Sequence, residues 1–347
     1  MSRPTLRDVA QAAGVHAATV SRALNPATQA QVNPATAKRV LKAAKALGYR
    51  PNPIARSLKT SRSGTVGMVI PDIANPLFPP MVRGLESVLE PNGYNCWVVS
   101  TDNDACRQAD LVAALQSNHV DGFVLATAKV DDPLLQKLHD EGAKVVLVNR
   151  RTRNLPIPSV VADDAAGISL AVAHLKHLGH TRIAHLAGPQ NTSTGADRST
   201  AFRHAIRDQS LEEDPQLVVE CADWREQFGA EALRTLLDRG AEFTAVVAGN
   251  DLIALGCYDV FAETGLRCPE DISVIGFNDM MFMDKVQPPL TSVRLPHREV
   301  GAEAGRLLVE MLNSGIDDGR SILLPVELVV RGSTAAPPGG PAPRSGR

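Results

Sequence analysis

Apolar residues near the start of the chain recur with the spacing of a short helix. Positions 6, 9, 10 and 13 are apolar and share one helical face. Thr5 and Asp8 have the spacing of a capping box, in which the Thr hydroxyl caps the helix and the acid reaches back to the cap. Gly14 supplies a left-handed residue that stops the helix. We therefore expect a helix from about Leu6 to Ala13.

A second helix is expected from about Ala17 to Asn25, with Val20 and Leu24 on its buried side. The first two helices are short and a glycine-containing turn joins them, which is the pattern of a helix-turn-helix.

The third helix has clear signals at both ends. Asn33 provides the cap, Pro34 suits the first helical position, and Gly48 provides the stop. Apolar positions 40, 41, 44 and 47 are expected to be buried. The first fifty residues thus predict an all-α module of three helices.

Beyond position 62 the pattern changes to short apolar runs that alternate with amphipathic helical stretches. The runs fall into two successive sets and predict strands at Val66–Ile70, Asn95–Ser100, Gly122–Ala126, Lys144–Asn149, Ile183–Ala187, Leu217–Cys221, Ala245–Ala248 and Ile272–Phe277. Strand and helix in alternation predict parallel, doubly wound sheets with helices on both faces. Two sets of strands predict two α/β lobes.

Composition is that of an ordinary globular chain, with 44% hydrophobic and 21% charged residues in 347. No stretch approaches the roughly 20 apolar residues of a membrane-spanning helix, and the first residues do not resemble a secretory signal. Five scattered cysteines, odd in number and without a C-x-x-C pair, indicate reduced thiols. We expect a cytoplasmic protein that requires no cofactor.

Charge is divided unevenly along the chain. Residues 1–62 carry eleven Lys or Arg and one acid, whereas residues 63–347 carry 25 Lys or Arg against 37 Asp or Glu. A basic head on an acidic body suits binding to the phosphate backbone of DNA, although a solvated basic tail would show the same charge.

The helical pattern in the basic head favours DNA binding over a structural three-helix module. The N-terminal half of the second helix would enter the major groove, where Arg22 can pair with a guanine or clamp a phosphate. Ala17 and Ala18 offer only methyl contacts. The residues of the head expected at DNA are Thr5, His16, Ala17, Ala18, Thr19, Ser21, Arg22 and Asn25.

Several separate motifs resemble the lactose-repressor (LacI/GalR) family of bacterial transcriptional regulators. The resemblance covers roughly residues 4–333 and is carried by Leu6–Val15, Thr19–Asn25, Leu47–Pro53, Ala55–Leu58, Asn250-Asp251 and Gly276-Phe277. It implies a helix-turn-helix head, a hinge helix, and a two-lobed core of the periplasmic-binding-protein type. It also implies a homodimer that binds palindromic operator DNA.

The implied hinge helix lies at about Asn52–Lys59. A segment this short is not helical alone in water, so it is expected to fold only beside its dimer mate on DNA. By the resemblance, Leu58 inserts into the minor groove as an apolar wedge and Ala55 approaches the groove floor. The alternative for Leu58 is packing within a linker.

The resemblance also implies a small-molecule effector between the lobes, and ligands of open α/β sheets bind beyond the carboxyl ends of the strands. Arg198 matches an effector motif, Arg-x-x-Gly-Phe, with Ala201 in the place of the usual glycine, and Asn278 stands where relatives often carry Asp. The expected effector residues are Asp72, Asn75, Leu77, Phe78, Asn149, Arg150, Arg198, Trp224, Asn250 and Asn278.

Each of these assignments has a structural alternative. Asp251, next to Asn250, is expected to cap the helix from Leu252 to Thr264. Arg198 could be a surface ion-pair residue, and Trp224 could pack the lobes together. The spacing of His174, His177 and His180 permits a metal site, but a helix C-terminus explains histidines equally well.

We therefore expect a head at residues 1–50, a hinge and tether at 51–62, and a core at 63–333. By the resemblance, the chain crosses between the lobes near 161–163, 289–294 and 319–323, so lobe N is expected from about 63–162 and 294–320, and lobe C from about 163–291 and 321–333. The Pro- and Gly-rich residues 334–347 are expected to be a disordered tail.

The functional prediction is a DNA-binding regulator, most simply a repressor of carbohydrate genes controlled by a sugar-like effector. Control by a partner protein, or by a non-sugar metabolite such as a nucleobase or nucleoside, is the alternative. An enzyme is not expected, because the sequence has no P-loop, G-x-S-x-G, H-E-x-x-H or G-x-G-x-x-G motif.

Overall fold

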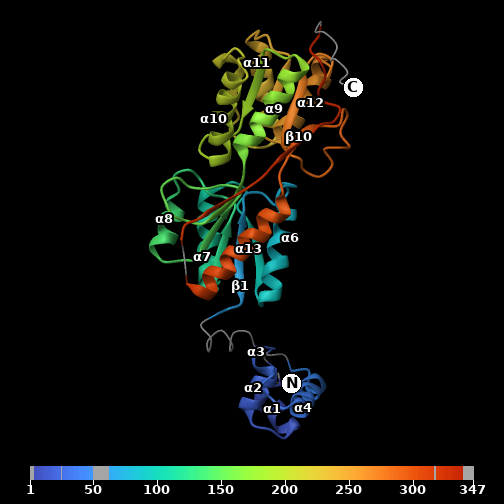
Figure 1. Cartoon of the computed structure of the whole chain (residues 1–347). Helices are drawn as coiled ribbons and strands as arrows, with labels where there is room; N and C mark the ends of the chain where they lie inside the picture. Colours follow the sequence, from blue (N-terminus) through green and yellow to red (C-terminus); the bar gives the residue numbers. More distant parts are fainter. Residues whose placement is uncertain (1–3, 25, 50–61, 316–317, 339–347) are drawn as a thin grey trace. The chain divides into compact units, whose positions relative to one another are not determined.

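The computed structural model describes residues 4–24, 26–49, 62–315 and 318–338 (Figure 1). The chain divides into two compact units, Met1–Ser63 and Gly64–Arg347. The expected hinge, with Ala55 and Leu58, and residue Asn25 lie outside the described residues.

The first unit contains short helices around a small core. They are α1 (Leu6–Ala13), α2 (Ala17–Ala23), α3 (Pro26–Gln29) and α4 (Pro34–Leu47). The Thr5–Asp8 capping box forms, and Gly14 and Gly48 end α1 and α4 with left-handed backbone. Val9, Val20 and Val40 are fully buried where the helices meet.

Two details of this unit differ from expectation. The short helix α3 has no apolar spacing to predict it. Leu41 and Leu47, expected in the core, are 46% and 40% exposed, and Ala37 is buried instead. The buried stripe of α4 runs through Ala37, Val40 and Ala44, so positions 41 and 47 fall beside it.

The second unit is built on two six-stranded sheets. The first has the order β11-β5-β4-β3-β1-β2, with β1 (Thr65–Ile70), β2 (Asn95–Ser100), β3 (Gly122–Leu125), β4 (Val145–Val148), β5 (Ser159–Ala162) and β11 (Ser321–Leu324). The second has the order β12-β10-β9-β8-β6-β7, with β6 (Ile183–Ala187), β7 (Val218–Glu220), β8 (Ala245–Ala248), β9 (Ser273–Asn278), β10 (Thr291–Arg294) and β12 (Glu327–Val329). All pairs are parallel except β10 with β12.

Helices cover both faces of each sheet, which confirms the doubly wound α/β fold (Figure 1). The first sheet, with α6 (Phe78–Leu89) and α13 (His297–Ser314) on one face and α7 (Ala105–Ser117) and α8 (Pro133–Asp140) on the other, forms the first lobe. The second sheet forms the second lobe, with α11 (Glu226–Asp238) and α12 (Asp251–Thr264) on one face and α9 (Asp164–Leu178) and α10 (Ser193–Asp208) on the other. Two short 3-10 helices, η1 (Glu90–Asn92) and η2 (Pro215–Leu217), precede β2 and β7.

The chain passes between the lobes three times. The first crossing, between β5 and α9, lies where it was expected. The second lies between β10 and α13, after residue 294, because all of β10 pairs with β9 in the second sheet. The third lies between β11 and β12. Residues 321–324 were expected in the second lobe, but β11 pairs with β5 of the first.

The C-terminal residues from Thr334 to Pro338 are ordered, which corrects the disorder expected from residue 334 onward. Thr334 contacts His174 through its hydroxyl at 3.0 Å, and the backbone of Ala335 bonds both His180 and Ser273. These residues lie against the C-terminal end of α9. Within the described ranges, no helix has the length and apolar character needed to cross a membrane.

Candidate functional site

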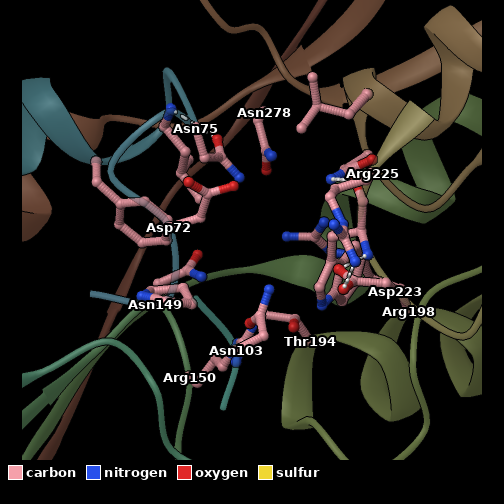
Figure 2. A pocket seen from close by; sticks show the side chains of 16 residues that line it. Asp72, Asn75, Asn103, Asn149, Arg150, Thr194, Arg198, Asp223, Arg225 and Asn278 are labelled. Carbon is pink, nitrogen blue, oxygen red and sulfur yellow. Dashed lines mark hydrogen bonds and ion pairs between the residues drawn. The ribbon is translucent and has the colours of Figure 1, made fainter. Parts of the chain in front are cut away.

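A pocket opens at the carboxyl ends of the strands of both lobes (Figure 2). It encloses about 480 Å³ of space not filled by protein atoms, which includes solvent at its mouth. Its lining residues are Pro71, Asp72, Asn75, Leu77, Phe78, Asn103, Asn149, Arg150, Thr194, Arg198, Asp223, Trp224, Arg225, Asn250, Leu252 and Asn278.

Sheet topology explains why the pocket forms at this place. In the first sheet β1 lies between β2 and β3, and in the second β6 lies between β7 and β8. The strand order reverses at these points, so the connections leave on opposite faces and a crevice remains at the carboxyl ends. Figure 2 shows Asp72 and Asn75 on one side of the pocket and Arg198 and Asp223 on the other.

The structure brings together all ten side chains that the sequence indicated for the effector. Six lining residues were not anticipated: Pro71, Asn103, Thr194, Asp223, Arg225 and Leu252. Asn103 follows β2 and Asp223 follows β7, so the rule used for the other strands would have found both. Thr194 lies at the start of α10, one turn before Arg198.

Arg198 is an ion-pair residue, as its structural alternative supposed, but it is 2% exposed rather than on the surface. Its Nε and Nη2 each lie 2.8 Å from Oδ1 of Asp164, and its Nη1 donates to the Gly249 carbonyl at 2.7 Å. Burial raises the pKa of Asp164, and the Arg198 charge opposes that rise. The pair fixes the guanidinium at the wall of the pocket.

Asn250, rather than Asp251, caps α12. The Asn250 Oδ1 accepts from the Ile253 amide at 2.8 Å, and its Nδ2 donates to the Trp224 carbonyl at 3.1 Å. Asp251 is the first helical residue and is 0% exposed; it accepts from the Met280 amide at 2.7 Å and from the Ser292 hydroxyl at 2.5 Å. Burial raises the pKa of Asp251 to about 7, against the effect of these hydrogen bonds.

Asn149 and Arg150 reach the pocket through a tight turn. Asn149 has a φ of +63°, and the Arg150 amide donates to the Val148 carbonyl at 2.6 Å, which closes a three-residue turn after β4. The Arg151 amide then donates to the Ser193 hydroxyl of the second lobe at 2.9 Å. Burial lowers the pKa of Arg150 to about 10, so the guanidinium is charged at neutral pH.

Trp224 packs on a residue that has no side chain. A Cβ built on Gly188 would lie 2.1 Å from the Trp224 ring, so the ring occupies the space that glycine leaves open. The Trp224 Nε1 is buried and has no hydrogen-bond partner among the described residues. Trp224 thus both packs against the second lobe and presents a free donor.

Asn278 and Asp279, at the carboxyl end of β9, both have left-handed backbone, with φ of +114° and +52°. The Asn278 side chain lines the pocket, and its Oδ1 has no hydrogen-bond partner in the described part of the chain. Asp279 is not among the lining residues and forms 2.7 Å ion pairs with Arg294 and Arg331. Because Arg294 ends β10, this turn joins the pocket to the second crossing.

In the head, most of the described residues expected at DNA lie on or beside α2. His16 caps this helix, with its Nδ1 accepting from the Ala18 amide at 3.2 Å. Ala18 and Arg22 are exposed. Ala17, Thr19 and Ser21 are half-buried, and Thr5 is exposed at the cap of α1.

The three histidines of the expected spacing lie on α9 (His174 and His177) and just after its end (His180). His174 and His180 bind the C-terminal residues, and His180 also contacts the Thr244 hydroxyl at 2.8 Å. Across the described ranges, no three His, Cys, Asp or Glu side chains are grouped as metal ligands would be.

Comparison with known proteins identifies the family to which this chain belongs. Residues 5–52 match the family described as "Bacterial regulatory proteins, lacI family", and residues 172–334 match "Periplasmic binding protein-like domain". The regulator RegA of Clostridium saccharobutylicum is 34% identical over 331 residues, which cover 95% of this chain and 99% of RegA. The chain belongs to the lacI family of bacterial regulatory proteins.

Other members of the lacI family are similar over the same length. CelR of Thermobifida fusca is 36% identical, with 95% of this chain and 98% of CelR covered. Among solved structures, the complex of CelR with cellobiose has 34% identity and a TM-score of 0.74, covering 95% of this chain and all of that one. A lac repressor dimer on operator DNA has 27% identity and a TM-score of 0.84, covering 96% and 100%.

Membership of the lacI family confirms a DNA-binding transcriptional regulator rather than an enzyme. The helix-turn-helix head and the periplasmic-binding-protein-like core are likewise confirmed.

Proposed function

We propose that this chain is a repressor of carbohydrate genes whose operator affinity is set by a sugar or sugar derivative bound between the lobes. The observation that carries the proposal is the pocket itself, which draws polar side chains from the strand ends of both lobes. Two similar solved structures are complexes with cellobiose and with ribose, which supports a carbohydrate.

The chemistry of the lining suits a hydroxylated ligand. Four of the five lining asparagines, Asn75, Asn103, Asn149 and Asn278, supply amide donors and acceptors for hydroxyl groups. The Asp72 carboxylate accepts from hydroxyls. Phe78 and Trp224 add apolar surface on which the CH face of a sugar ring can pack.

The DNA-binding arm of the proposal rests on the head. The exposed Arg22 of α2 would contact a base or a phosphate in the major groove, flanked by Ala18 and His16. A homodimer would place two heads on the half-sites of a palindromic operator. The proposed hinge contacts of Leu58 and Ala55 fall on residues outside the described ranges.

Ligand and DNA would be coupled through the second unit. A ligand that contacts both lobes favours one angle between them, and the affinity of the dimer for operator DNA depends on that angle. Coupling of this kind is reciprocal, so operator DNA must change ligand affinity by the same factor.

The test uses the tryptophans as reporters. The chain has two, Trp97 and Trp224, and only Trp224 lines the pocket. In a Trp97→Phe background, titration with cellobiose, ribose and other sugars should change the Trp224 emission, and the same sugar should change operator affinity in fluorescence anisotropy. A panel of sugars that alters neither signal would reject the proposal.

A nucleobase or nucleoside is the second candidate ligand. It is favoured by one feature, the presence of two flat aromatic rings, Phe78 and Trp224, in the same pocket. Adenosine, cytidine, uridine and the free bases belong in the same titration, where a response to them alone would replace the sugar.

A further inference from the structure

The pocket is lined by more positively charged side chains than negatively charged ones. Three arginines and two carboxylates line it: Arg150, Arg198, Arg225, Asp72 and Asp223. Arg198 is already bonded to the carboxylate of Asp164, outside the lining. Arg225 and Asp223 form a 3.0 Å ion pair. Asp72 accepts from the Ala74 amide at 2.8 Å.

Arg150 differs from the other two arginines. It is only 7% exposed, and among the described residues no carboxylate lies within 4.0 Å of its guanidinium nitrogens. Its Nε is buried without a hydrogen-bond partner in the same set. A buried cation without a partner is costly, because water no longer solvates it and no anion replaces the water.

The surroundings of Arg150 explain how it is held there. The turn at Asn149 directs the chain into the cleft, and on its other side Arg151 is tied to the second lobe through Ser193 and Asp197. Arg150 is therefore held at the junction of the lobes, with its side chain in the pocket lining (Figure 2).

We propose that Arg150 receives an oxyanion carried by the ligand, so that the effector is an acidic sugar, with a carboxylate or a phosphate. This inference rests on the proposed function, since it assumes a hydroxylated ligand in this pocket. A planar guanidinium can bind either oxyanion through two parallel hydrogen bonds. The asparagines and Asp72 are then left to bind the hydroxyls, and the unpartnered Oδ1 of Asn278 accepts one more.

The competing explanation lies within the chain. Asp223 stands across the cleft and raises the pKa of Arg150 by its charge, so the two could form an ion pair when the lobes move. In that case Arg150 would be a latch between lobes, and no ligand anion would be needed.

Matched pairs of ligands test the proposal on the full chain. Glucose is compared with glucuronate and glucose 6-phosphate, ribose with ribose 5-phosphate, and cellobiose with cellobionate, by calorimetry at constant ionic strength. We expect an acidic member to bind at least about tenfold more tightly than its neutral parent, from charge-assisted hydrogen bonds. Comparison of the carboxylates with the phosphates identifies the anion.

Two variants locate the effect. Arg150→Gln should abolish the preference for the acidic member, whereas Arg153→Gln, three residues away and exposed, should keep it. A neutral parent that binds as tightly as its acid, or a preference that survives Arg150→Gln, would overturn the inference and leave the sugar-binding function standing. A response to nucleosides alone would instead reject the proposed function.

Inorganic phosphate gives a result even if every sugar in the panel is inactive. Phosphate, compared with chloride at equal ionic strength, should raise the Tm of the unaltered chain and of Arg153→Gln more than that of Arg150→Gln. Equal shifts in all three would refute an oxyanion site at Arg150. Asp223→Asn tests the latch. If Arg150 and Asp223 form a latch, Asp223→Asn and Arg150→Gln should lower the Tm equally, and the double variant should lower it no further. That result would also overturn the inference.

Discussion

The guanidinium carbon of Arg198 lies 3.7 Å from the centre of the Phe277 ring, so the face of one group covers the face of the other. The edge of the same guanidinium is bonded to Asp164 and to the Gly249 carbonyl. One side chain of α10 thereby joins the start of α9, the end of β8 and the end of β9. The pocket wall is rigid at this point because stacking and hydrogen bonds restrain the same planar group.

Replacement of Arg198 by Lys should weaken the effector response and leave ligand-free operator binding intact. An ammonium keeps the charge beside Asp164 but cannot cover the Phe277 ring or bond in a plane, so we expect effector affinity to fall about tenfold or more. Operator anisotropy with and without ligand measures both quantities. Arg203→Lys, exposed on the same helix, is the control. A normal response in Arg198→Lys would place the ligand elsewhere.

Asp251→Asn should alter how stability depends on pH. The folded-state pKa of Asp251 is near 7, above its ordinary value of 3.8, so folding favours the protonated acid. Its stabilising contribution is complete below about pH 4 and is lost as pH rises through 7. The Asn variant lacks this loss, so its stability relative to the unaltered chain should increase from pH 5 to pH 8.

Urea unfolding at four pH values across that interval measures the difference. Asp271→Asn is the matched control, because its ion pair with Arg267 lowers the pKa of Asp271 to about 2 and its titration is complete below the interval. A constant difference between the Asp251→Asn variant and the unaltered chain would contradict the raised pKa.

Truncation of the C-terminus at two neighbouring positions should give chains of different stability. A chain that ends at Ser333 loses the bonds of Thr334 and Ala335 to His174, His180 and Ser273, and we expect it to be about 2 kcal/mol less stable. A chain that ends at Pro338 keeps them and should match the full chain. The measurement is the free energy of unfolding in urea, and equal values for both truncations would disprove the contribution of this segment.

Arg22→Ala should weaken operator binding by about 1–3 kcal/mol and relax sequence preference if Arg22 contacts a base. Lys42→Ala, exposed on α4, should at most lower affinity equally for all sequences and reduce the salt dependence. Anisotropy on a selected operator and on its single-base variants separates the two effects. Unchanged preference in Arg22→Ala would confine that residue to the phosphate backbone.

The sequence predicted the strand ends of the pocket well because one rule governs them. In a parallel sheet, the residues directly after each buried strand lie at the same edge, which groups Asp72 with Asn149 in the first sheet. Asn278 ends β9 of the second sheet, and the family resemblance was needed to bring it to the same site. The strands β5, β10, β11 and β12 were not predicted. They have three or four residues each and lie at the crossings, where tertiary pairing rather than local pattern defines a strand.

Two further predictions differ from the structure, the cap of α12 and the disordered tail. Asn250 and Asp251 are both good caps, and the extended backbone of Asn250, with φ of −155° and ψ of 178°, decides between them. Likewise, composition predicted a disordered tail from residue 334. Specific bonds to two histidines hold its first residues, and no compositional rule contains that information.

The three crossings between β5 and α9, β10 and α13, and β11 and β12 make each lobe discontinuous in sequence. The first lobe is assembled from separate stretches of chain, so no single peptide cleavage can release it as a fragment. A protease that nicks one crossing would leave the two halves attached through the other two. Relative motion of the lobes is thereby confined to bending about three short connections, and the two walls of the pocket remain permanently tethered to each other.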